Sequence, residues 1–305
     1  MEGGSAARLT GVGGRESRRQ AYTDVFTASC QASHRTAAKP TTYRGYFVHI
    51  PTPPPPIQRA SLLPMPREIQ FISDLHLSLE KTEITKRFLS YLERQAPRAE
   101  AVYILGDLFD AWIGDDDPTP PNGKIRKQLK QLTSSGTQVY LQQGNRDFLL
   151  GQRFCDETAV NLLGDYAVID LFGTPTLLTH GDLLCTDDLP YQAFREKAHT
   201  PEWQQNVLSK PLWLRLIAAR WYRLRSHFHK RGKTQDIMDV NQQTVIEIMR
   251  EHGVLQLIHG HTHRPAIHEF EIDGQKAKRF VLPDWKKGSA QALCWTKQGH
   301  RLEAI

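Results

Sequence analysis

Five short apolar segments are each followed by Asp, His or Asn, and this repeated pattern constrains the fold more than any other feature of the chain. The segments are residues 68–73, 101–105, 139–141, 176–179 and 255–258. Longer helical patterns separate them, which is typical of an α/β domain. Ligands of open α/β sheets bind beyond the carboxyl ends of the strands, so we expect the five polar turns to meet at one site.

The side chains in these turns are of the types that bind metal ions. They form the motifs Asp74-Leu75-His76, Gly106-Asp107, Gly144-Asn145-Arg146-Asp147, His180-Gly181-Asp182 and His259-Gly260-His261-Thr262-His263. Imidazole with carboxylate and amide oxygens suits Mn, Fe, Zn or a similar divalent ion. Asp74 and His76 are two residues apart in an expected extended segment, which directs both to one side. One such motif alone is usually a turn, but five in order predict a metal centre.

The net charge of +6 does not predict a nucleic-acid partner. Residues 1–64 carry eight Lys or Arg and three Asp or Glu, a net of +5, which leaves +1 for the remaining 241 residues. A nucleic-acid footprint should lie on the folded domain. No stretch approaches the ~18 apolar residues that a membrane span needs. Four widely scattered cysteines suggest a reduced, cytosolic compartment, and no pattern suggests a protein partner.

The composition divides the chain into two regions. Residues 1–64 are rich in Gly, Ser, Thr, Ala and Arg and end in a proline cluster, so they are expected to be disordered. An alternative is that Met65 is the natural start. Residues 65–305 are expected to form the catalytic domain.

The ordered motifs resemble those of the calcineurin-like metallophosphoesterase superfamily, over residues 68–305. The resemblance implies an α/β fold of two packed β-sheets flanked by helices (αββα). It also implies two metal positions that share the bridging carboxylate of Asp107. The first would be held by Asp74, His76, Asp107 and His263, and the second by Asp107, Asn145, His180 and His261. Arg146 would be the catalytic residue, because a guanidinium beside a metal ligand offers bidentate hydrogen bonds to a phosphate.

Longer stretches look like one branch of this superfamily, the UDP-2,3-diacylglucosamine diphosphatases: residues 71–77, 106–114, 144–148, 237–241 and 258–265. This similarity implies hydrolysis of a pyrophosphate to 2,3-diacylglucosamine 1-phosphate (lipid X) and UMP in lipid A biosynthesis, by a water activated by two Mn²⁺ ions. The enzyme would be peripheral on the cytoplasmic face of the inner membrane. Implied substrate contacts are Asn145, Arg146, Asp188, Ser226, Lys230, Lys233 and His261.

Two alternatives stay open. One is a soluble metallophosphoesterase that acts on unacylated phosphodiesters or nucleotides, and the other is a scaffold of the same fold without turnover. The complete set of ligand residues argues against the scaffold.

A helical lid insertion is predicted at about residues 188–235. Apolar side chains recur there at spacings of 4, 4, 3 and 4, which places them on one helix face: Trp213, Ile217, Trp221, Leu224 and Phe228. Residues 210–233 also hold eight basic residues and no acidic one. A basic helix with tryptophans suits a phospholipid surface or a cap over acyl chains. Packing of this face on its own domain is an equally weighted alternative.

Acidic residues beside the motifs have two expected roles. Asp110, Asp147 and Asp182 are expected to orient metal-bound histidines. The run Asp115-Asp116-Asp117 is expected to be a solvated loop without a metal role.

Overall fold

The computed structural model describes residues 68–230 and 239–305, with side chains described for all of these except 223–230. These residues belong to one compact unit, Arg59–Ile305. The expectations for residues 1–64 and for Lys233 fall outside the described residues, as do those for the side chains of Ser226 and Lys230.

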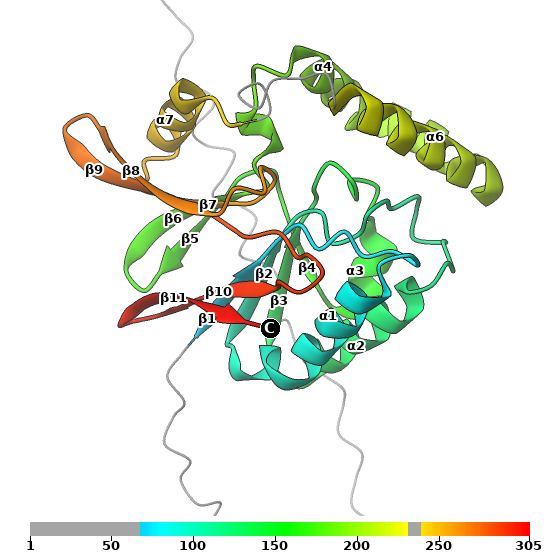
Figure 1. Ribbon diagram of the computed structural model, residues 1–305, viewed down its shortest axis with the longest axis horizontal. Helices are drawn as coiled ribbons and strands as arrows, with labels where there is room; N and C mark the ends of the chain where they lie inside the picture. The colour runs from blue at the N-terminus through cyan, green and yellow to red at the C-terminus, as the bar shows by residue number, and fades with distance from the viewer. Residues whose placement is uncertain (1–67, 231–238) are drawn as a thin grey trace, which may run out of the picture. The chain divides into compact units, whose positions relative to one another are not determined.

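Two β-sheets form the centre of this unit (Figure 1). The six-stranded sheet has the order β11-β10-β1-β2-β3-β4, and the five-stranded sheet the order β5-β6-β7-β9-β8. The strands of the first sheet are β1 (Ile69–Ile72), β2 (Ala101–Leu105), β3 (Gln138–Gln142), β4 (Asn161–Leu163), β10 (Gln291–Thr296) and β11 (Gly299–Ala304). Those of the second are β5 (Ala167–Leu171), β6 (Thr174–Thr179), β7 (Gln256–His259), β8 (Ala266–Ile272) and β9 (Gln275–Val281).

The five segments predicted to be strands are β1, β2, β3, β6 and β7. In the first sheet β1, β2 and β3 are parallel neighbours, and in the second β6, β7 and β9 are parallel neighbours. Parallel neighbours end at the same edge of their sheet, so each sheet presents its polar turns at one edge.

Alternation along the strands explains why two sheets and two helical layers pack together. Phe71 points into a core shared by the two sheets, whereas Ile72 points into the core beneath α1 and α2. In the second sheet Ile258 joins the core between the sheets, and Leu257 joins a third core with α7. A strand that is apolar on both faces must be covered on both faces. The predicted two-sheet sandwich flanked by helices is thereby confirmed.

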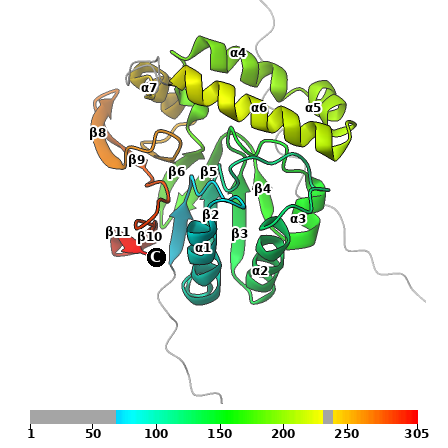
Figure 2. The same ribbon diagram turned by 45° about the vertical axis from the view of Figure 1, so that its right-hand side comes forward.

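Seven α-helices and two short 3₁₀ helices lie in the described residues (Figures 1 and 2). The α-helices are α1 (Thr82–Arg94), α2 (Asn122–Ser134), α3 (Gln152–Thr158), α4 (Leu189–Ala198), α5 (Pro201–Leu208), α6 (Leu212–Lys230) and α7 (Gln242–Glu251). The 3₁₀ helices are η1 (Ala96–Arg98) and η2 (Asp182–Leu184). In Figure 2, α1 and α2 lie along the first sheet and α4, α5 and α6 form a separate group. Within residues 68–230 and 239–305 no helix is both long enough and apolar enough to cross a bilayer.

Arg215 fastens α6 to the loop that follows β2. Its guanidinium donates to both carboxylate oxygens of Asp116 and to the carbonyl of Ile113, and the side chain is buried. Hydrogen-bonded charge pairs of this fork type are directional as well as strong. Arg215 is one of the eight basic residues in 210–233, a stretch expected to suit a phospholipid surface, and that prediction is wrong for this residue because it points inward.

The three consecutive aspartates all have hydrogen-bond partners within the fold, although Asp116 is also exposed to solvent. Asp115 accepts hydrogen bonds from the indole of Trp112 and from the backbone of Gly151 and Phe154, which fixes the start of α3. Asp117 is buried and accepts from Thr119 and Asn122. The expectation of a solvated loop is therefore wrong for Asp115 and Asp117, whose carboxylates bind groups of the fold, whereas Asp116 is exposed as expected and also pairs with Arg215.

Candidate metal centre

Left-handed backbone shapes the site. Five of its non-glycine residues have φ between 50° and 68°: Asp74, His76, Asp107, His261 and His263. Such values are uncommon for residues with a Cβ, and they cluster where surrounding structure imposes them for function. The spacing of Asp74 and His76 predicts an extended segment. This prediction is wrong, because both residues have a left-handed backbone conformation. Their N–H groups instead bond to the carbonyls of Gly106 and Asp107, at 3.2 and 2.9 Å.

One group of donor atoms combines the end of β1 with the loop after β7. Atoms of Asp74, His76 and His263 all lie within 4.8 Å of one another. His263 Nε2 is 3.3 Å from His76 Nε2 and 3.3 Å from Asp74 Oδ1. Asp74 and His76 are buried. These three residues were predicted at the first metal position.

A second group combines the loop after β3 with the ends of β6 and β7. Asn145 Oδ1 lies 3.2 Å from His180 Nε2 and 3.0 Å from His261 Nδ1, and these two nitrogens are 3.2 Å apart. Asp107 stands between the groups, with Oδ1 3.8 Å from His180 Nε2 and Oδ2 3.6 Å from His76 Nδ1. All seven predicted ligand residues thus lie together.

The site fits divalent cations because several nitrogen and oxygen atoms that can each offer a lone pair converge there. His180 Nδ1 lies 2.9 Å from the carbonyl of Leu105, which only accepts, so Nδ1 donates to it and Nε2, which faces Asn145 Oδ1, is the nitrogen that can bind a cation. Asp74 Oδ1 and His76 Nδ1 are buried without a hydrogen bond in the described residues. Buried polar atoms without partners are costly, and a cation would satisfy them.

Electrostatics also favour a cation at this centre. Burial and the nearby carboxylates of Asp147 and Asp74 together raise the pKa of Asp107 to about 7. Burial lowers the pKa of His76 to about 2, which keeps its ring neutral. Burial alone would lower the pKa of His180, but the carboxylates of Asp107 and Asp74 raise it to about 9. The buried carboxylates of Asp74 and Asp107 thus favour a positive charge beside them, which a bound cation would supply.

Arg146 is half-buried next to Asp107. Its backbone N–H donates to Asp107 Oδ1 at 2.8 Å, and its carbonyl accepts from Trp112 N. Within the described residues its guanidinium makes no hydrogen bond or ion pair, so the chain leaves this fork available to a phosphate.

Glycine is required where the turns touch one another. A Cβ on Gly144 would overlap the amide nitrogen and carboxylate of Asp107, reaching 2.9 Å from Asp107 Cγ. A Cβ on Gly260 would overlap Asp74 in the same way. These glycines permit the close approach of turns that the sequence pattern suggested.

Replacing Gly144 with alanine is expected to abolish activity and weaken metal binding, because Asp107 must shift from between the two donor groups. Gly123→Ala is the matched control, since nothing lies within 4 Å of a Cβ there, and helix α2 should gain up to about 1 kcal/mol. Metal titration and thermal unfolding of both variants would measure this. Normal metal affinity in Gly144→Ala would contradict the requirement.

The other predicted substrate contacts are only partly described. Asp188 is the N-cap of α4, where its carboxylate accepts from Tyr191 N at 3.3 Å. It lies in the connection from His180 to α4, as its place in the sequence suggested. The side chains of Ser226 and Lys230 and the whole of Lys233 lie outside the described residues.

Two of the carboxylates expected to orient histidines, Asp147 and Asp182, make hydrogen bonds to other groups. Asp147 accepts from the backbone of Gly144 and Phe109 and so joins two loops. Asp182 binds Arg195 Nε at 2.7 Å and the hydroxyl of Tyr191. These hydrogen bonds go to backbone groups, Arg195 and Tyr191, so an orienting role of Asp147 and Asp182 toward the histidines stays a prediction.

Asp284 is a carboxylate at this site that the sequence motifs did not identify. Its Oδ2 lies 3.1 Å from His263 Nδ1, and its side chain is 8% exposed. A signal was present, because the apolar run Phe280-Val281-Leu282 precedes Asp284 as other apolar runs precede the five motifs. Phe280 and Val281 end strand β9, which is parallel to β7 and ends at the same edge.

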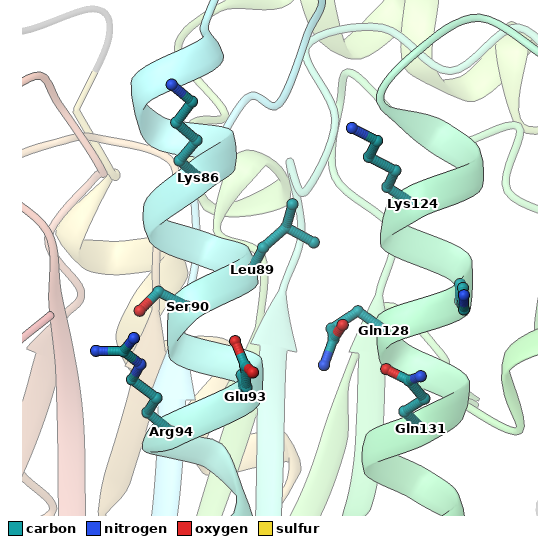
Figure 3. Close-up of a pocket in the computed structure, with 9 residues that line it drawn as sticks. Lys86, Leu89, Ser90, Glu93, Arg94, Lys124, Gln128 and Gln131 are labelled. Carbon is teal, nitrogen blue, oxygen red and sulfur yellow. The ribbon is translucent and has the colours of Figure 1, made fainter.

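A separate groove of about 420 Å³ lies between α1 and α2. Figure 3 shows Lys124, Gln128 and Gln131 on α2 opposite Leu89 and Glu93 on α1. None of the predicted site residues lines it. The groove between α1 and α2 is therefore separate from the candidate metal centre.

Comparison with known proteins agrees with this geometry. Residues 68–265 match the family model for calcineurin-like phosphoesterases. Proteins named UDP-2,3-diacylglucosamine hydrolase are similar over most of their length. The one from Vibrio vulnificus strain YJ016 is 48% identical over 237 residues, which are 76% of this chain and 96% of that protein. The one from Pseudomonas aeruginosa strain UCBPP-PA14 is 49% identical over 233 residues, which are 76% of this chain and 97% of that protein.

Proposed function

Because the chain belongs to the calcineurin-like phosphoesterase family, we propose that it hydrolyses the pyrophosphate of UDP-2,3-diacylglucosamine. The products are UMP and 2,3-diacylglucosamine 1-phosphate (lipid X), an intermediate of lipid A biosynthesis. The observation that carries the proposal is the convergence of seven ligand-type side chains at the ends of both sheets, in a chain about 48% identical to hydrolases named for this substrate.

The family is metal-dependent, and we assign two metal positions to this chain. Asp74, His76, Asp107 and His263 would hold one ion, and Asp107, Asn145, His180 and His261 the other. When bound, divalent ions would activate a water molecule and neutralise charge on the phosphate oxygens. We take Mn²⁺ as the physiological ion, which suits a set of nitrogen and oxygen donors without thiolate.

The chain's own residues hold and orient the pyrophosphate. Arg146 offers two parallel N–H donors to the phosphate whose negative charge grows in the transition state. Its backbone N–H bond to Asp107 holds the Arg146 main chain beside the donor groups. We assign further substrate contacts to Asn145 and His261 at the centre, to Asp188, and to Ser226, Lys230 and Lys233.

Helix α6 presents an apolar stripe to the outside of the fold. Trp213, Ile217 and Trp221 are 63%, 57% and 60% exposed, whereas Arg215 on another face is buried. A stripe that packed on its own domain would be covered, so the described part of the stripe does not favour that alternative. Exposed apolar patches mark contact surfaces. We propose that α4–α6 form the helical lid insertion, with this stripe against the substrate's acyl chains.

Trp213→Glu and Ile217→Glu are expected to lower kcat/KM for the acylated substrate about tenfold to a hundredfold. This corresponds to losing the burial of one large apolar side chain, about 1.5–3 kcal/mol. Cleavage of a small unacylated phosphodiester should change less than about twofold. Leu302→Glu, an exposed leucine on strand β11, is the matched control. Equal losses on both substrates would exclude the stripe as an acyl contact.

The substrate's acyl chains also place the reaction at a membrane. We propose peripheral attachment at the cytoplasmic face of the inner membrane, supported by the basic residues and exposed tryptophans of α6. Co-sedimentation with vesicles that contain anionic phospholipid tests this attachment, and a protein that stays in the supernatant excludes it.

The direct test is incubation of the purified protein with Mn²⁺ and UDP-2,3-diacylglucosamine, followed by detection of UMP. Release that a chelator abolishes, and that falls sharply when the acyl chains are removed, supports the proposed function. UMP release that is indifferent to acylation would instead favour a phosphoesterase for unacylated substrates. No release under any divalent ion would exclude the reaction.

A further inference from the structure

We propose that Asp284 is a positioning residue of the metal centre, which holds the ring of His263 so that Nε2 faces the first metal position. The inference rests on the metal-dependent function proposed above. It assigns a role to the connection between β9 and β10, a segment that carries no recognised motif. The observation behind it is the 3.1 Å contact between Asp284 Oδ2 and His263 Nδ1.

Both ring nitrogens of His263 face carboxylate oxygens, Nδ1 that of Asp284 at 3.1 Å and Nε2 that of Asp74 at 3.3 Å. Asp74 is a predicted metal ligand and Asp284 is not, so Nδ1 can keep its proton by donating to Asp284 while Nε2 offers its lone pair to an ion. Nε2 is also the atom that lies 3.3 Å from both His76 Nε2 and Asp74 Oδ1. The hydrogen bond to Asp284 therefore selects the tautomer that the first donor group needs.

The segment that carries Asp284 is held on both sides. Leu282 N donates to the carbonyl of His259 at 2.7 Å, and Trp285 N donates to the carbonyl of Asp74 at 3.2 Å. The indole of Trp285 is buried against Phe88 and Tyr91. Asp284 is thus fixed between two segments that themselves carry predicted ligands, so its carboxylate has little freedom to leave His263.

His263 needs this support more than the histidines of the second group. It is 36% exposed, and its left-handed backbone, with φ of 56°, does not by itself fix the ring. His180, in contrast, is 2% exposed and is held by the backbone carbonyl of Leu105. His180 is oriented by the main chain, and His263 by a carboxylate from the connection between β9 and β10.

Asp284→Ala is expected to weaken one of two Mn²⁺ binding steps by about tenfold to a hundredfold, the range found when partners of metal-bound histidines are removed. The other step, which depends on His180 and His261, should keep its affinity. Calorimetric titration of metal-free protein separates the two steps. Asp284→Asn keeps an acceptor oxygen and should lose less than Asp284→Ala.

Lys286→Met is the matched control within the segment. Lys286 Nζ lies 3.0 Å from Asp284 Oδ1, but its side chain is 62% exposed, so its removal should change Mn²⁺ affinity less than about threefold. A large effect of Lys286→Met would show that charge in the segment, rather than the bond to His263, controls binding.

A double-mutant cycle separates positioning from a general structural role. If Asp284 acts through His263, the double variant Asp284→Ala, His263→Ala should bind Mn²⁺ no more weakly than His263→Ala alone. Additive losses overturn the inference, as do two unchanged binding steps in Asp284→Ala. Wild-type protein that binds no divalent ion overturns it together with the proposed function. Wild-type protein that binds two ions but releases no UMP refutes the proposed reaction only.

Discussion

Asn145→Ala and His261→Ala are each expected to lower the rate of UMP release by at least about 1,000-fold. Each change removes one of three donor atoms that meet within 3.2 Å, and a bound ion contributes several kcal/mol to transition-state stabilisation. Folding should be retained, because both side chains are partly exposed and neither belongs to an apolar core. The measurement is initial rate at saturating Mn²⁺, with circular dichroism to verify the fold.

Asn206→Ala and His268→Ala are the matched controls for those two changes. Asn206 is exposed on α5 and His268 is exposed on the edge strand β8, and neither is a predicted ligand. Both should keep wild-type rates. Undiminished turnover in Asn145→Ala or His261→Ala would refute the assignment of the second metal position.

Arg146→Ala is expected to lower kcat/KM by about 100- to 1,000-fold, with Mn²⁺ affinity nearly unchanged. The guanidinium makes no ion pair in the described residues, so its removal should cost little stability, whereas the developing phosphate charge loses two donors. Arg146→Lys restores the charge but not the planar fork, and an intermediate rate is expected.

Arg153→Ala controls for the loss of a positive charge. Arg153 is exposed on α3 and pairs with Glu157 one turn away. Its removal should leave the rate unchanged. If Arg146→Ala instead weakened metal binding and left kcat unaltered at saturating metal, Arg146 would serve the site's structure and not the phosphate.

The sequence predicted the strands and the site because both depend on local patterns. Each of the five segments is apolar on both faces and ends in a polar turn, which identifies a buried parallel strand and places its end. The backbone conformation of the turns was harder to predict from the sequence. Curled Asp74 and His76 are stabilised by carbonyls of Gly106 and Asp107, which belong to the next strand's turn. The spacing of Asp74 and His76 in the sequence gives no information about such a partner.

Long-range partners explain the other differences. Asp284 serves His263 only because β9 lies beside β7, and Arg215 turns inward only because Asp116, 99 residues earlier, lies beneath α6. The aspartates at 115–117 looked solvated because their partners are backbone groups of distant loops. Charge and polarity are visible in a sequence, but the identity of the partner depends on tertiary packing.

The backbone of His261 donates to Asp74 Oδ2 across 187 residues, and this bond has a consequence for how the protein is made. Closing so long a loop costs entropy that only the packed sheets can offset, so the first donor group assembles late in folding. A nascent chain that stops before residue 263 lacks a donor of that group. Metal acquisition is thus expected to follow synthesis and packing of the second sheet, so the ion stabilises the finished enzyme instead of nucleating its folding.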